Sequence, residues 1–178
     1  ILPKKERSYE EANSPDSVPI PVEKTEVLVV AVQNDAISKL HSVVSGCSLD
    51  AGFFEVEIFA SVRANFEHEL SPVLLIDFGA SRTKLSIVEF GIIKNYHTVN
   101  RGGADITDAI AKSLDIPFLK AEELKKEFGL FDNKTEKDLN NIIKSHLDYI
   151  FSETNNVLLG YEKKYNRTVS KIIFSGGG

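Results

Sequence analysis

The fold of this chain is decided by residues 73–103, which read VLLIDFGASRTKLSIVEFGIIKNYHTVNRGG. Residues 73–76 are wholly apolar and stop at Asp77, which is the pattern of a buried strand that ends at a polar edge. Residues 84–90 and 92–99 have the composition of two further strands, with a glycine between them as the turn. The stretch therefore predicts a three-stranded meander with a carboxylate at its rim.

The turn between the first two strands has the residue types of an anion site. Gly79, with the small Ala80 beside it, lets backbone N–H groups approach an anion closely, and Ser81 and Thr83 add hydroxyl donors. Asp77 could hold a hydrated divalent cation that faces the same anion, or activate a water molecule. A tight hairpin also favours Gly and Ser, and an Asp at a strand end often only accepts a backbone N–H. Spacing alone therefore leaves a purely structural interpretation open.

Composition limits the class of protein. The chain has 178 residues, of which 42% are hydrophobic, so it can bury a core. The formal net charge of -5 provides no electrostatic footprint for nucleic acid or for an anionic membrane surface. No apolar run reaches the roughly 20 residues of a membrane-spanning helix, so we expect membrane contact only through a partner. The four histidines are dispersed, which gives a zinc site little support.

The single cysteine and the missing methionines also carry information. Cys47 cannot form an internal disulfide, and its place on an apolar helical stripe predicts a buried structural thiol in a reducing cytoplasm. The chain contains no methionine and ends on three glycines directly after an apolar run. We therefore expect a fragment of a longer protein.

The first part of the chain predicts an arm followed by alternating strands and helices. Residues 1–24 are rich in charge and proline, as linkers are. Residues 25–32 predict a buried strand, and Asn34 can cap a helix that packs through one apolar face. Residues 53–57 predict a short strand and residues 58–66 a short helix. This order of elements suggests a right-handed parallel crossover.

The remainder predicts helices and one more strand. Ser71-Pro72 marks a domain boundary, because proline cannot donate to a strand ladder. Residues 104–114 and 119–128 predict two helices, and residues 135–161 predict either one kinked helix or two. Residues 169–174 predict a buried strand parallel to the first strand of the meander.

Four motifs between residue 77 and residue 178 occur in the order that one known superfamily has. They are residues 77–83 (DFGASRT), 102–107 (GGADIT), 121–125 (AEELK) and 175–178 (SGGG). Together they resemble the actin-like ATPase superfamily, and within it the PilM family of type IV pilus assembly proteins, whose close relative is the cell-division protein FtsA. The resemblance implies an α/β, ribonuclease H-like fold: a mixed five-stranded sheet with helices on both faces, with a nearly complete second lobe and a partial first lobe.

The resemblance also implies a division into domains. Residues 1–70 would be the closing part of the first actin-like domain, and residues 71–178 the second domain with a helical insertion, truncated at the adenosine loop. Residues 10–12 and 18–22 are similar to a Glu-rich helix and an Ile-Pro-x-Pro turn of the family's small inserted subdomain. No match to the family's first phosphate loop precedes Asp77, so we expect this chain to bind nucleotide weakly or not at all.

ATP and Mg²⁺ are the ligands that the resemblance implies, with Asp77 holding Mg²⁺ through water. Glu122 and Lys125 share a helix face, where their default meaning is a solvated ion pair. Relatives use the equivalent Glu and Lys to contact ribose and adenine, and a glycine loop for the base. The implied nucleotide-binding residues are Gly79, Ala80, Ser81, Thr83, Gly102, Gly103, Glu122, Lys125, Gly176, Gly177 and Gly178.

Three functions follow from these expectations. The first is an ATP-binding scaffold of the type IV pilus platform that is cytoplasmic and held at the inner membrane through partners. Its partners would be the cytoplasmic tail of a PilN-like inner-membrane protein and pilus motor or platform proteins; self-association is possible and any ATP hydrolysis slow. The second is an FtsA-like division protein that polymerises at the membrane. The third is a phosphotransferase of the same fold, such as a sugar or acetate kinase, which would need a general base near an acceptor hydroxyl.

Overall fold

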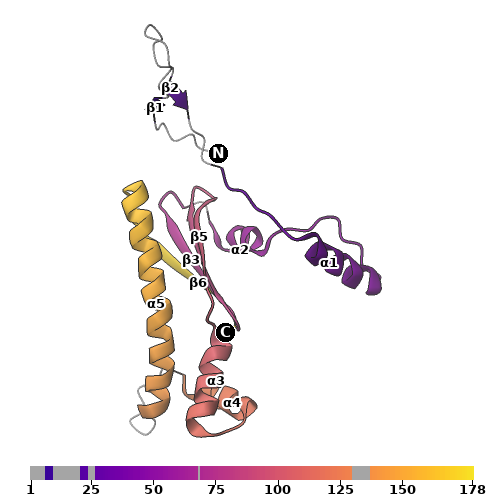
Figure 1. The fold of residues 1–178 in the computed structure, drawn as a ribbon, viewed down its shortest axis with the longest axis vertical. Coiled ribbons are helices and arrows are strands. Elements are labelled where there is room, and N and C mark those ends of the chain that lie inside the picture. The colour runs from indigo at the N-terminus through magenta and orange to yellow at the C-terminus, as the bar shows by residue number, and fades with distance from the viewer. Residues whose placement is uncertain (1–6, 10–20, 24–26, 68, 130–136) are drawn as a thin grey trace. The chain divides into compact units, whose positions relative to one another are not determined.

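The structure is a computed structural model in which two compact units, Ile1–Phe54 and Glu55–Gly178, are each considered by themselves. It describes residues 7–9, 21–23, 27–67, 69–129 and 137–178 (Figure 1). The predicted domain division at 1–70 and 71–178 concerns the whole protein and stays a prediction.

The first unit contains a short antiparallel pair and one helix. β1 (Arg7–Tyr9) pairs with β2 (Pro21–Glu23), and α1 spans Asn34–Gly46. No residue of α1 is buried, so the prediction that this helix packs through one face is wrong for the described residues. Cys47 caps the C-terminal end of α1 and is exposed; the expected buried thiol is wrong because no described segment of this unit covers the helix. Of the features predicted at 10–12 and 18–22, residues 10–12 and 18–20 lie outside the described residues, whereas residues 21–22 belong to β2; β1 and β2 also lie within the predicted linker at 1–24.

Two strands predicted near α1 do not form. Residues 27–33 pair with no other described segment, and Val29 is 81% exposed. The strand predicted at 53–57 is also absent, since Phe53 is 79% exposed and Glu57 already begins a helix. A strand needs a hydrogen-bonded neighbour, and no described segment supplies one here, so the predicted crossover is not built by the described residues.

The second unit is built on a mixed sheet of four strands. They are β3 (Val73–Phe78), β4 (Thr83–Glu89), β5 (Ile92–Val99) and β6 (Lys171–Gly176), in the order β5-β4-β3-β6. The first three form the predicted antiparallel meander, and β6 runs parallel to β3 as predicted. The expected fifth strand is not found, because no further described segment pairs with β5 or β6.

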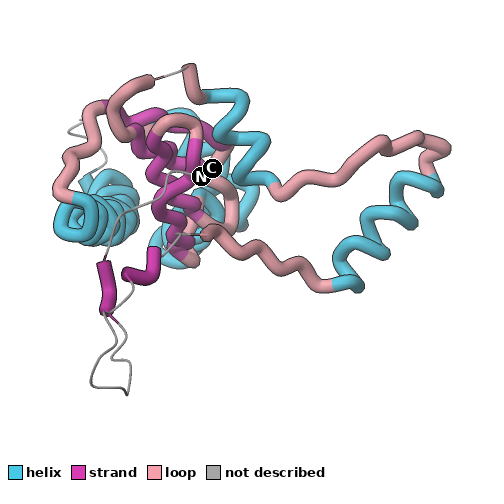
Figure 2. The backbone as a smooth tube through the Cα atoms, turned by 90° about the horizontal axis from the view of Figure 1, so that it is seen from above, coloured by secondary structure: helices cyan, strands magenta, loops and turns pink. Residues whose placement is uncertain are grey.

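Four helices accompany the sheet. They are α2 (Glu57–Asn65), α3 (Gly103–Leu114), α4 (Phe118–Phe128) and α5 (Lys137–Tyr165). α5 is a single helix, which resolves the question of one helix or two. Within this unit the strands lie between α5 and α2, so the prediction of helices on both faces is confirmed (Figures 1 and 2). No helix among the described residues combines the length and apolar character needed to cross a membrane.

The alternation of side chains along β3 assigns each residue to one face. Leu74 and Ile76 pack in one cluster with Ile150 and Tyr161 of α5, whereas Leu75 packs in another with residues of α2 and β4. Successive side chains of a strand point to opposite faces. Asp77 therefore lies on the α2 face and Phe78 on the α5 face.

A third apolar cluster ties α3, α4 and α5 together beside the sheet. Its buried members are Ile106, Ile110, Ala121, Leu139 and Ile143, and Phe78 of β3 packs against it. α3 and α4 are thereby attached to the end of β3, where the predicted site begins.

Candidate functional site

Two loops predicted to bind phosphate are bonded to each other through their backbones. The Gly103 N–H donates to the Gly79 carbonyl oxygen at 3.0 Å, and the Ala104 N–H donates to the Ala80 carbonyl oxygen at 2.7 Å. The N-terminus of α3 therefore lies directly on the β3–β4 hairpin loop.

The end of β6 reaches the same place. The Gly178 N–H donates to the Phe78 carbonyl oxygen at 2.9 Å. Gly176 has φ +110°, and a Cβ on it would lie 2.2 Å from the same oxygen, so only glycine fits there. Gly177 differs, because nothing lies within 4 Å of its Cβ position. Three loops that are distant in sequence thus meet at one edge of the sheet.

Close packing explains the glycines of the α3 turn. A Cβ on Gly102 would lie 2.3 Å from the Gly79 oxygen and 2.5 Å from the Ala80 oxygen. A Cβ on Gly103 would lie 2.3 Å from the Gly178 carbonyl carbon. The space that these side chains would need is filled by backbone of the neighbouring loops, so the glycines are required for the loops to meet.

The N–H groups at the start of α3 are engaged within the protein. Asp105 Oδ2 accepts a hydrogen bond from the Gly102 N–H at 2.8 Å, so Asp105 caps the start of α3. Gly103 and Ala104 donate to the hairpin loop as described above. These glycines accordingly support the shape of the edge, and their predicted contact with nucleotide stays a prediction.

Glu122 and Lys125 lie beside this edge in a bonded network. Lys125 Nζ is 2.9 Å from Glu122 Oε2 and donates to the Gly103 carbonyl oxygen at 3.0 Å. Thr107 Oγ1, which is fully buried, donates to Glu122 Oε2 at 2.5 Å. This hydroxyl and the Lys125 ammonium lower the pKa of Glu122 from 4.5 to about 2. A charged pair of predicted nucleotide contacts is thus held against the glycine loops.

Asp77 lies at the rim of the sheet, next to the ammonium group of Lys84. Its side chain is 19% exposed, and Lys84 Nζ lies 3.7 Å from its Oδ2. Lys84 also donates to Glu57 Oε2 at the start of α2, and this hydrogen bond raises the pKa of Lys84. No cluster of three His, Cys, Asp or Glu residues occurs in the described part of the chain. A single carboxylate still suits Mg²⁺, which commonly takes one or two carboxylates with water and phosphate oxygens.

The two hydroxyls predicted as anion donors are placed differently. Ser81 is exposed at the hairpin tip. Thr83 is fully buried, and its Oγ1 donates to the Arg101 carbonyl oxygen at 2.8 Å. The Arg101 guanidinium carbon lies 4.6 Å from the centre of the Tyr149 ring of α5. In this structure Thr83 therefore supports the segment before Gly102 instead of presenting a donor to an anion.

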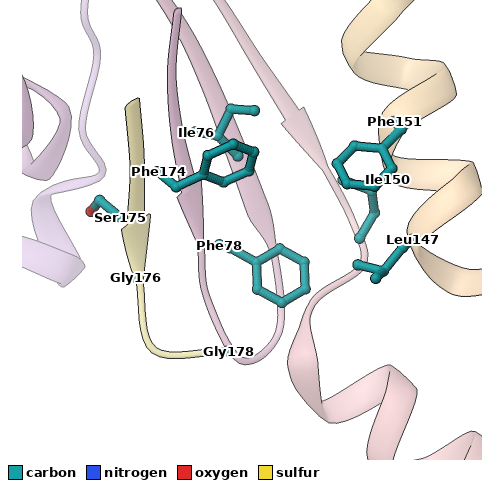
Figure 3. A pocket seen from close by; sticks show the side chains of 9 residues that line it. All are labelled: Ile76, Phe78, Leu147, Ile150, Phe151, Phe174, Ser175, Gly176 and Gly178. Carbon is teal, nitrogen blue, oxygen red and sulfur yellow. The ribbon is translucent and has the colours of Figure 1, made fainter. Parts of the chain in front are cut away.

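An apolar pocket of about 300 Å³ opens beside the glycine edge, between α5 and the ends of β3 and β6 (Figure 3). Its lining is Ile76, Phe78, Leu147, Ile150, Phe151, Phe174, Ser175, Gly176 and Gly178. The volume is at the lower end of the range for small-molecule sites.

Similarity in sequence points to FtsA. Residues 74–150 match the family model described as "Cell division protein FtsA". The FtsA of Staphylococcus epidermidis is 25% identical over 158 residues, which cover 76% of this chain and 34% of that protein. The FtsA of Neisseria meningitidis serogroup B is 27% identical over 114 residues, covering 63% of this chain and 28% of that protein. The chain therefore spans about a third of the length of these curated relatives.

Similarity in structure identifies the fold. A PilM-PilN type IV pilus biogenesis complex aligns with a TM-score of 0.68 at 22% identity, over 81% of this chain and 41% of that one. MreB5 of Spiroplasma citri bound to ADP aligns with a TM-score of 0.65 at 19% identity, over 83% of this chain and 55% of that one. The chain has the actin-like ATPase fold. Within this fold it is a partial domain, as the four-stranded sheet indicates.

For two side chains of the site, those of Lys84 and Thr107, we predicted no functional role. Lys84 lies across the hairpin from Asp77, and pairing the two predicted strands in register would have brought it there. Thr107 lies one helical turn after Gly103 and links it to Glu122. Its spacing of four residues from Gly103 could have predicted its contact with the Gly103 carbonyl group. Its bond to Glu122, in contrast, depends on how α3 packs on α4.

Proposed function

We propose that this chain is an ATP-binding actin-like domain that acts as a nucleotide-dependent scaffold. One observation carries the proposal: the loops ending in Gly79, Gly103 and Gly178 meet at one sheet edge, with the Glu122–Lys125 pair held against them.

Each part of this edge suits one part of a magnesium nucleotide. The exposed tip at Ala80 and Ser81 would face the phosphates, and Asp77 would hold Mg²⁺ through water. Glu122 and Lys125 would face ribose and base, and Gly177 has open space on the side where a base could lie. When bound, the metal would neutralise phosphate charge; the protein residues position and orient the nucleotide.

A ligand that bridges two domains stabilises the closed arrangement by its higher affinity for that arrangement. We infer that nucleotide sets the surface that the whole protein offers to its partners, and that any hydrolysis is slow. By analogy with the PilM-PilN complex, the partner would be the cytoplasmic tail of a PilN-like inner-membrane protein. The protein would then lie in the cytoplasm, held at the membrane through that partner.

An FtsA-like role in cell division is the second candidate, and the matched residues 74–150 favour it. Binding of a PilN-like tail peptide, measured by calorimetry, would support the pilus role. Sedimentation of polymers that form only with ATP and Mg²⁺ would support the division role. Peptide binding without polymers would favour the pilus role, and polymers without peptide binding would favour the division role.

The sequence predicts weak nucleotide binding or none, and the proposed site requires at least weak binding, which a titration can detect. In a ¹⁵N-¹H spectrum titrated with ATP and Mg²⁺ to millimolar concentrations, the amide signals of Gly79, Gly103 and Gly178 should shift together. The amide of Gly160 in α5 is the internal control, because nothing crowds that residue and it lies away from the edge. Adenosine should shift fewer of the edge signals, since it lacks phosphates. Shifts that avoid the edge, or none at all, would refute the proposed site.

A further inference from the structure

One ammonium group stands between two carboxylates at the site. Lys84 lies directly opposite Asp77 in the β3–β4 register, so both side chains share the face of the sheet that α2 covers. Lys84 Nζ is 3.7 Å from Asp77 Oδ2 and donates to Glu57 Oε2 in the first turn of α2. The Lys84 side chain is 25% exposed and that of Glu57 is 66% exposed, so Glu57 is the partner more open to solvent.

In this arrangement Lys84 and a divalent cation would compete for the carboxylate oxygens of Asp77. A metal ion at Asp77 needs the carboxylate that Lys84 already approaches, and two cations within a few ångströms repel each other. The hydrogen bond from Lys84 to Glu57 draws the ammonium away from Asp77 and toward α2. The position of Lys84 therefore decides how much of the Asp77 carboxylate a metal ion can reach.

We propose that Lys84 determines how tightly Asp77 holds a divalent cation, and that Glu57 favours metal binding because it draws the Lys84 ammonium away from Asp77. The inference rests on the proposed function, in which Asp77 is the metal-binding carboxylate. It predicts opposite effects of two substitutions on neighbouring residues: Lys84→Gln strengthens metal binding because the competing charge is gone. Glu57→Gln weakens it, because Lys84 then has Asp77 as its one carboxylate partner among these three residues.

Mn²⁺ is a suitable probe, because it replaces Mg²⁺ and broadens nearby amide signals. The experiment titrates Mn²⁺, alone and with ADP, into the ¹⁵N-labelled chain and follows the signals of residues 77–84. Lys84→Gln should lower the dissociation constant of Mn²⁺ by roughly 3- to 10-fold, as expected for one partly screened charge. Glu57→Gln should raise it by roughly 2- to 5-fold, and Lys84→Arg should stay near wild type.

A matched control separates this effect from a change in overall charge. Lys112→Gln removes a lysine that pairs with Asp108 on the exposed surface of α3, so it should leave the Mn²⁺ affinity unchanged. Thermal unfolding of each variant verifies that the sheet is intact.

The outcomes distinguish the metal site at Asp77 from the role of Lys84 in it. If Mn²⁺ broadens residues 77–84 with equal affinity in wild type, Lys84→Gln and Glu57→Gln, the metal site stands and the role of Lys84 is overturned. It is also overturned if both substitutions shift the affinity in the same direction. If Mn²⁺ broadens no signal at this edge in any variant, the metal-binding part of the proposed function fails, and the inference fails with it.

Discussion

Replacing Gly102 by alanine tests whether the three loops meet as described. Its Cβ would lie 2.3 Å from the Gly79 oxygen and 2.7 Å from the Ala80 carbonyl carbon, both of which are backbone atoms. Ordinary contact needs roughly 1 Å more, so the hairpin loop has to move away from α3. That movement breaks or stretches the bonds from Gly103 to Gly79 and from Ala104 to Ala80.

The expected loss can be worked out from these contacts. Two backbone hydrogen bonds contribute about 1–3 kcal/mol together, and the strain of overpacking adds about 1–3 kcal/mol. We therefore expect Gly102→Ala to lower the free energy of unfolding by about 2–6 kcal/mol, a large part of the stability of an ordinary domain. The signals of Gly103 and Ala104 should also lose their protection from hydrogen exchange.

The assay is urea unfolding followed by far-ultraviolet circular dichroism, with the midpoint compared at constant slope. Gly160→Ala is the matched control, because Gly160 lies in α5 with nothing within 4 Å of its Cβ position. That change should raise the free energy of unfolding by about 0.5–1 kcal/mol, since alanine favours helix. The reasoning is refuted if Gly102→Ala unfolds at the same urea concentration as wild type, or if both variants are stabilised.

Three further predictions concern stability. Glu122 has a pKa lowered to about 2, so its contribution is present above about pH 4.5 and lost as the pH falls toward 2. Glu122→Gln should therefore flatten the acid side of a stability–pH curve and cost about 0.5–1 kcal/mol at neutral pH; an unchanged curve would contradict the network. Tyr161 donates to the buried Glu89 at 3.2 Å, and burial, then the charge of Glu89, raises the pKa of its hydroxyl, so its stabilisation is lost as the pH rises above about 10. Tyr161→Phe should cost about 1–2 kcal/mol in urea unfolding at neutral pH, a loss that should shrink above about pH 10. Ile110→Ala, at a fully buried position of α3, should cost about 2–5 kcal/mol. Leu119→Ala, at a position that is 77% exposed, should change stability by less than about 0.5 kcal/mol, and equal losses would contradict the described core.

Local patterns predicted the second unit well. Residues 92–99 were predicted as a strand and form β5 over the same bounds. Residues 104–114 and 119–128 were predicted as two separate helices, and Asp115 ends α3 in the left-handed conformation at φ 52°. Such signals depend on a few neighbouring residues, which is why they can be read without knowing the fold.

The same kind of reasoning failed at residues 25–32. Their β-branched composition suits a strand, but composition supplies no hydrogen-bonding neighbour, and among the described residues none pairs with them. The prediction that Cys47 is buried failed for a related reason, because an apolar stripe becomes buried only where another element covers it.

The sequence by itself determined the meander, the parallel strand after it and the helices α3 and α4, together with the glycines at their ends. Only the tertiary structure decided that the loops at Gly79, Gly103 and Gly178 touch, and that Thr107 reaches Glu122. The physical reason is that periodicity reports which face of an element is apolar. Contact between residues about a hundred positions apart depends on how the whole sheet packs and on which strands lie side by side.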